Sequence, residues 1–207
     1  GHDEIFWTVT IYDKSSLNSE IDHAQKISEQ NASYRQYLVE GNWSTFTSAL
    51  NTASTRLTTR AITQNELDSA ENTLNNAANA LVFAASDTEL QAKLSEAMAI
   101  YNSNTYATDY TADSRATFED IITRVRNSSY ATTQYPAYSD ALAGSRAAQD
   151  QAVIDSLTEQ VALAIKSLQK CGARFAAADG FVAAHMVSDC ATGAHVPASN
   201  DLLHGAT

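Results

Sequence analysis

Residues 14–27, KSSLNSEIDHAQKI, return as a pattern at residues 87–100, DTELQAKLSEAMAI. In both segments the apolar side chains are separated by steps of four and three residues. The matching positions are Leu17, Ile21, Ala24 and Ile27 in the first segment and Leu90, Leu94, Ala97 and Ile100 in the second. This spacing places them on one face of an α-helix. The two segments therefore predict two amphipathic helices with equivalent buried faces.

Two further apolar patterns repeat in the same order along the chain. Phe46, Ala49, Leu50 and Ala53 recur as Phe118, Ile121, Ile122 and Val125. Leu67, Ala70, Leu74, Ala77, Ala78 and Leu81 recur as Ile154, Leu157, Val161, Ala164, Ile165 and Leu168. Three amphipathic helices with short connections form an antiparallel bundle, and a repeated order of three indicates a repeated module. We therefore predict an all-α fold of two tandem three-helix bundles.

The predicted boundaries follow from where the helical patterns begin and end. The first module spans residues 13–84 and the second spans residues 85–170. Thr63 followed by Glu66 forms a capping box at the start of the third helix. Residues 1–12 predict a short N-terminal strand, because apolar side chains recur at every second position from Ile5 to Ile11. This strand either pairs with another part of the chain or belongs to an upstream domain. Residues 171–207 predict an irregular tail.

The second copy contains an insertion, which we expect to be a loop spanning residues 127–150. It carries Tyr130, Tyr135 and Tyr138 in a polar context without helical spacing. Exposed tyrosines stack on sugars or anchor protein contacts, so these three are the candidate binding residues. Alternatively, the loop folds over a bundle and buries them.

Composition excludes some classes of partner. The formal net charge is −11, and charged residues make up 18 % of the chain. Nucleic-acid binding requires clustered Lys and Arg, so we expect no nucleic-acid partner. The chain also lacks a stretch of about 18 apolar residues, so we expect no membrane-spanning segment.

Cys171 and Cys190 are the two cysteines of the chain. A disulfide between them indicates an oxidising compartment, whereas two free thiols remain the alternative. Together with His185 and His195 they contain the right atoms for a zinc site. The long gaps between them do not match the usual pairs of zinc ligands, so we expect no metal and no cofactor.

Catalytic residues are not evident in the sequence. Neighbouring carboxylates such as Glu119 and Asp120 occur, but acid–base catalysis requires them in a cleft with shifted pKa values. No nucleophile, base and orienting group can be assembled from the pattern. Trp43 and Phe46 lie on apolar stripes, where packing in the core is the expected role. We therefore expect a protein that is not an enzyme.

Several residues resemble the FIVAR module, a small three-helix repeat of bacterial surface proteins. They are Lys14 and Leu17 in the first helix, Tyr37 before the second, Trp43 to Phe46 with Ala49 and Leu50, and Thr63 with Gln64 opening the third. The resemblance covers about residues 13–169, and the second copy diverges, with Arg115 where the family has Trp. The strand followed by a helical tandem also resembles the non-catalytic front of a Bacteroidetes-type surface lipoprotein.

The resemblance implies a bacterial cell-surface or secreted protein that acts as a spacer, an adhesin or a surface for an unknown protein or glycan. One alternative is an accessory module of a larger secreted carbohydrate-active enzyme. A second alternative, from the cysteines and histidines, is a small metal-dependent enzyme centred on the tail.

Overall fold

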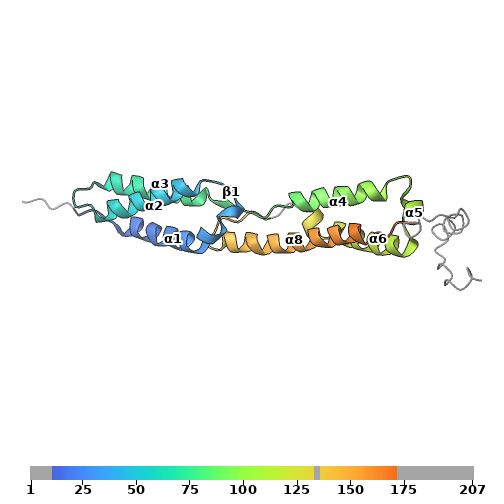
Figure 1. Cartoon of the computed structure of the whole chain (residues 1–207). Helices are drawn as coiled ribbons and strands as arrows, with labels where there is room; N and C mark the ends of the chain where they lie inside the picture. Colours follow the sequence, from blue (N-terminus) through green and yellow to red (C-terminus); the bar gives the residue numbers. More distant parts are fainter. Residues whose placement is uncertain (1–10, 133–135, 172–207) are drawn as a thin grey trace, which may run out of the picture. The chain divides into compact units, whose positions relative to one another are not determined.

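The computed structural model describes residues 11–132 and 136–171, and these residues form two compact units. The described residues of the first unit are 11–85 and 136–151, and those of the second are 86–132 and 152–171. Helices dominate both units, and the sheet content of the described residues is one short two-stranded sheet (Figure 1). The predicted, mostly α-helical fold class is confirmed.

The first unit is a bundle of three helices that contact one another: α1 (Ser15–Asn31), α2 (Trp43–Thr58) and α3 (Gln64–Asn79) (Figure 1). The predicted apolar stripes face inward and form one core. Its buried members on these helices are Leu17, Ile21, Ala24, Ile27, Phe46, Ala49, Ala53, Leu67, Leu74 and Ala78. Burial of these apolar stripes is the main force that holds the three helices together.

Polar side chains fix where α2 and α3 begin. The Asn42 Oδ1 atom accepts a hydrogen bond from the Thr45 amide at 2.9 Å, which caps α2. The predicted capping box of α3 is present, because the Thr63 amide donates to Glu66 Oε2 at 2.9 Å while the Glu66 amide donates to the Thr63 hydroxyl. These bonds use backbone donors that a helix start otherwise leaves without partners.

A small sheet closes one end of the first unit. The 3₁₀-helix η1 (Ala32–Tyr37) leads into β1 (Leu38–Glu40), which pairs antiparallel with β2 (Val82–Phe83). Gly41 follows β1 with φ of 84°, and a Cβ atom there would collide with the Ala80 carbonyl group. This sheet was not predicted from the sequence, because both strands are too short to show an alternating pattern.

The second unit contains α4 (Thr88–Tyr101), α5 (Tyr106–Asp109), α6 (Ala112–Arg126), α7 (Ser129–Thr132) and the later turns of α8 (Ala143–Ser167). Its buried apolar residues include Leu90, Leu94, Ala97, Phe118, Ile122, Val125, Ile154, Val161 and Ala164. Each lies at a position that the repeat predicted to face the core. The apolar pattern therefore specified the buried faces of both units.

The expected loop at residues 127–150 is wrong in two respects. Residues 129–132 form the short helix α7, and α8 begins at Ala143, so residues 143–150 are helical. The described residues 136–151 also belong to the first unit, although the prediction placed the whole insertion in the second module. The reason is packing, because Ala143 and Ala147 are fully buried in the core of the first unit.

Asn31 explains how the insertion is held there. It is a fully buried polar residue at the end of α1. Its Nδ2 atom donates to the carbonyl oxygens of Ile27 and Ala141, each at 3.1 Å, and its Oδ1 atom accepts from the Gly144 amide at 2.7 Å. One side chain thus satisfies backbone groups from α1 and from the insertion in the same place.

The two ends of the chain lie largely outside the described residues. Of the predicted N-terminal strand, only Ile11 and Tyr12 are described, and neither lies in a strand. Residues 172–207 of the predicted tail, which include Cys190, also lie outside. Among the described helices, the longest and most apolar stretches still fall short of what a membrane crossing requires.

Candidate functional site

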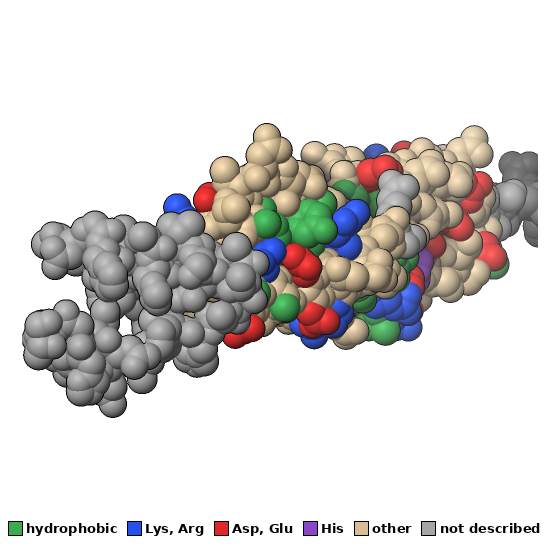
Figure 2. Space-filling model, turned by 90° about the vertical axis from the view of Figure 1, so that its right-hand side faces the viewer, with side chains coloured by type: hydrophobic (Ala, Val, Ile, Leu, Met, Phe, Trp, Pro, Cys, Tyr) green, Lys and Arg blue, Asp and Glu red, His purple; other side chains and the backbone are tan. Residues whose placement is uncertain are grey.

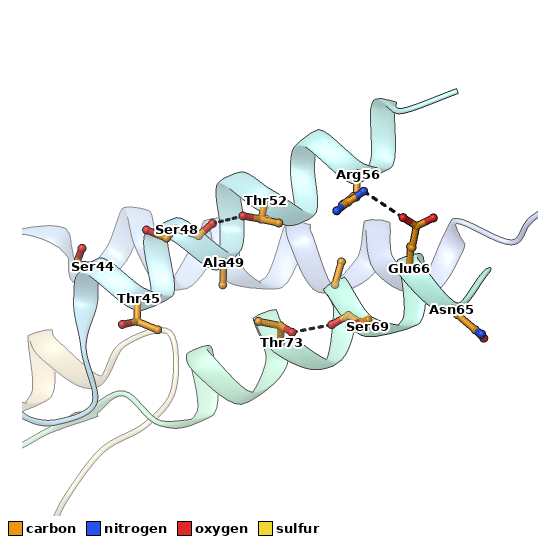
Figure 3. Close-up of a pocket in the computed structure, with 11 residues that line it drawn as sticks. Ser44, Thr45, Ser48, Ala49, Thr52, Arg56, Asn65, Glu66, Ser69 and Thr73 are labelled. Carbon is orange, nitrogen blue, oxygen red and sulfur yellow. Dashed lines mark hydrogen bonds and ion pairs between the residues drawn. The ribbon is translucent and has the colours of Figure 1, made fainter. Parts of the chain in front are cut away.

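A groove runs between α2 and α3 on the outer side of the first bundle (Figure 3). Its volume is about 590 Å³. The residues along it are mostly small and hydroxylated: Ser44, Thr45, Ser48, Ala49, Thr52, Arg56, Asn65, Glu66, Ser69, Ala70 and Thr73. Pockets of this size accommodate small molecules or short segments of a larger ligand.

The groove exists because small residues recur at one-turn spacing on both helices. On α2 they are Ser44, Ser48 and Thr52, and on α3 they are Ser69 and Thr73. Residues four apart lie one turn apart on the same face of a helix, so each series lines one side of the groove with short side chains. The larger apolar residues of the same helices point into the core and leave this outer side hollow.

Two threonine hydroxyls of the groove are already engaged with their own helices. Thr52 Oγ1 donates to the Ser48 carbonyl oxygen at 2.8 Å, and Thr73 Oγ1 donates to the Ser69 carbonyl oxygen at 2.7 Å (Figure 3). A hydroxyl has a single proton to donate and two lone pairs that accept. These threonines therefore offer acceptor oxygens to a ligand, and neither is aligned with a base that would activate it as a nucleophile.

One ion pair lies at the end of the groove. Arg56 Nη1 is 3.4 Å from Glu66 Oε1, and both side chains are about half exposed to solvent (Figure 3). Hydrogen bonds from the Thr63 amide and hydroxyl, and then the charge of Arg56, hold the pKa of the Glu66 carboxyl below its usual value. Glu66 is therefore ionised at neutral pH, and the one cation and one anion along the groove offset each other.

Tyr138, one of the three tyrosines predicted to bind, has a structural role in the first unit. Its backbone exchanges two hydrogen bonds with Phe83, at 2.8 and 2.9 Å, beside the small sheet. Its hydroxyl donates to Asp150 Oδ2 at 2.9 Å, and the Arg146 guanidinium lies 5.5 Å from the centre of its ring. Tyr138 therefore fits the alternative in which the inserted segment folds over a bundle and covers its tyrosines.

Of the other two predicted tyrosines, the structure describes Tyr130. Tyr130 is half-buried in α7 of the second unit, whereas Tyr138 belongs to the first unit. Tyr135 lies outside the described residues. A binding role for Tyr130 and Tyr135 stays a prediction.

Of the two cysteines in the predicted disulfide, the structure describes Cys171. Cys171 is disulfide-bonded, while Cys190, the partner expected from the sequence, lies outside the described residues. His185 and His195 lie outside as well, so the candidate zinc ligands of the tail stay predictions. Within residues 11–132 and 136–171, no three His, Cys, Asp or Glu side chains gather in a way that suits a metal ion.

A cluster of aromatic residues that was not predicted from the sequence lies in the second unit. The Tyr106 ring lies 5.4 Å from that of Tyr101 and 5.9 Å from those of Tyr110 and Phe118. Burial, followed by the negative charge of Glu119, raises the pKa of Tyr106 well above its usual value. The available signal was the presence of three tyrosines within residues 101–110, between two predicted helices.

Hydrophobic side chains form a confined patch among charged and polar ones on the face seen in Figure 2, and charges of both signs occur there.

Comparisons with known proteins yield no match for this chain, whether against family models, curated proteins or solved structures.

Proposed function

We propose that this chain is a non-catalytic helical module of a cell-surface or secreted bacterial protein. In this role it serves as a spacer or adhesin and contacts a protein or glycan through the groove between α2 and α3. The observation that supports a binding role most directly is the state of the groove hydroxyls. Those of Thr52 and Thr73 donate to helix carbonyls and present acceptor oxygens.

The character of the groove favours an uncharged ligand rich in hydrogen-bond donors. Arg56 and Glu66 offset each other, and the remaining polar groups along the groove are neutral. Sugar hydroxyls and backbone amides both supply donors to such acceptors. Ala49 and Ala70 add short apolar contacts between the two walls. Glycans and extended peptide segments are therefore the two ligand classes that we propose.

A pair of lysine substitutions on α3 tests this proposal. Ser69 and Asn72 are both exposed, but only Ser69 lies along the groove. Ser69→Lys fills the groove with a long charged side chain, whereas Asn72→Lys adds the same charge outside it. On arrays of glycans and extracellular proteins, Ser69→Lys is expected to lose at least about tenfold in affinity for the bound probe, or about 1.4 kcal/mol.

The control variant Asn72→Lys is expected to bind as the unsubstituted chain does. Equal binding by both variants would remove the groove from the proposal. A Tyr130→Ala variant on the same arrays addresses the remaining described tyrosine of the insertion.

The two alternatives from the sequence are separated by other observations. An accessory module of a larger carbohydrate-active protein predicts a catalytic or sugar-binding domain elsewhere in the full-length gene. A metal-dependent enzyme centred on the tail predicts stoichiometric zinc in the purified chain, which elemental analysis measures directly.

A further inference from the structure

Helix α8 supplies core residues to both units. Its first turns bring Ala143 and Ala147 into the core of the first unit, where both are fully buried. Its later turns carry Val161, which is fully buried and belongs to the second unit. The equivalent helix α3 begins at Gln64, which the repeat matches to Gln151. The turns of α8 before Gln151 are therefore an extension that α3 lacks, and this extension serves the other unit.

The described residues 136–151, here called the strap, are fastened to the first unit at two points. At one point the Tyr138 backbone exchanges two hydrogen bonds with Phe83, which is itself buried in the core of the first unit. At the other point the Gly144 amide donates to Asn31 Oδ1 at 2.7 Å, and both residues are buried. A buried polar side chain satisfied in this way fixes one arrangement of the segments that it joins.

The strap is also braced by its own side chains. The Tyr138 hydroxyl donates to Asp150 Oδ2 at 2.9 Å, which connects its two ends. Arg146 Nη1 lies 2.7 Å from Asp140 Oδ2, and Asp140 Oδ1 accepts from the Leu142 amide at 2.8 Å. These contacts join the turn before α8 to the first turns of the helix. We therefore expect the strap to dock or to leave as one piece.

The closest fit between the strap and the first unit is at Gly144. A Cβ atom at this position would lie 2.4 Å from Tyr34 Cβ and 2.9 Å from Asn31 Oδ1. Because a Cβ atom is fixed to its own backbone, rotation of the Tyr34 ring cannot relieve the first clash. Alanine is intrinsically a better helix former than glycine. Glycine at position 144 therefore favours docking of the strap at the expense of helix propensity.

We propose that the strap couples the folding of the two units, so that its release from the first unit destabilises the second. Coupling between distant sites requires an element whose state both sites influence. Helix formation is cooperative, so a helix that loses the anchor of its first turns frays from that end. In α8 this fraying advances toward Ile154, which is buried in the second unit. The proposal is independent of the α2–α3 groove.

Amide hydrogen exchange on the full chain tests the coupling. Gly144→Ala is expected to release the strap and to accelerate exchange at least about tenfold in residues 136–151 and at the end of α1. Coupling predicts a similar acceleration in α4 and α6 of the second unit. Since alanine favours the helix, a weaker α8 cannot account for that result. The control Gln149→Ala changes an exposed residue of α8 and is expected to leave exchange in both units unchanged.

Asn31→Ala releases the strap from the opposite side of the contact and leaves the sequence of α8 intact. The same acceleration in α4 and α6 is expected, even if this variant unfolds the first unit completely. Exchange in α4 and α6 that stays at the rate of the unsubstituted chain while the first unit loosens would overturn the proposal. Unchanged exchange of residues 136–151 in both variants would overturn it as well, because these contacts would then not hold the strap.

Discussion

The two units bury side chains at equivalent positions of the repeat but differ at their ends. In the first unit, the buried Asn31 joins the end of α1 to Ala141 and Gly144, and Phe83 of the short sheet pairs with Tyr138. In the second unit, the residue equivalent to Asn31 is Asn104, which is exposed, and tyrosines cluster nearby instead. The comparison shows that the repeated apolar pattern specifies the helices, whereas single polar or aromatic residues specify what closes each unit.

The largest effects are expected at equivalent core positions. Phe46 and Phe118 occupy the same place in the repeat, and both are fully buried. Phe46→Ala and Phe118→Ala are each expected to lower the free energy of unfolding by about 3–5 kcal/mol, because each leaves a cavity. Urea denaturation measures the loss, with Val39→Ala as an exposed control. A loss below about 1 kcal/mol at either position would break the equivalence of the two cores.

A smaller effect is expected where the units differ. Asn31→Ala leaves the Gly144 amide and the Ala141 carbonyl group without a side-chain partner, which is expected to cost about 1–3 kcal/mol. The equivalent change Asn104→Ala removes an exposed side chain and is expected to cost less than about 0.5 kcal/mol. Urea denaturation compares the two variants directly, and similar costs would contradict the role given to Asn31.

The smallest effect concerns the start of α3. Thr63→Ala removes one half of the capping box and is expected to cost about 1 kcal/mol. The exposed Thr73→Ala, which loses only a bond to its own helix, is the matched control. Urea denaturation at neutral pH measures both.

The same capping box predicts a dependence on pH. The pKa of the Glu66 carboxyl is lower in the folded chain than in the unfolded chain. The ionised carboxylate therefore stabilises the fold fully when the pH is above the pKa of Glu66 in the unfolded chain. This stabilisation is lost as the pH falls through the pKa of Glu66 in the folded chain. Thr63→Ala should therefore differ less from the unsubstituted chain under acid conditions than at neutral pH. A difference that stays constant with pH would show that Glu66 takes no part in the cap.

The sequence was sufficient for most helices because their burial follows a fixed period. Leu17, Ile21 and Ala24 are buried as predicted, and so are Leu90, Leu94 and Ala97. The capping box of Thr63 was equally readable, since both residues are close in sequence. Local patterns of this kind need no knowledge of distant parts of the chain.

The remaining features depend on contacts between distant residues. Asn31 and Gly144 are far apart in sequence, and no period connects them. Tyr138 resembled an exposed loop residue until its bonds to Phe83 and Asp150 were known. The groove was missed because its Ser and Thr residues are typical of any exposed helix face, and only the packing of α2 against α3 brings them together.

The most direct test of two separate cores is the double variant Phe46→Ala, Phe118→Ala. Substitutions that share no partners add within about 0.5 kcal/mol. The free-energy loss of the double variant should therefore equal the sum of the two single losses within that margin, as measured by urea denaturation. A departure of more than about 1 kcal/mol would show that Phe46 and Phe118 stabilise one shared core, and it would contradict the division into two units.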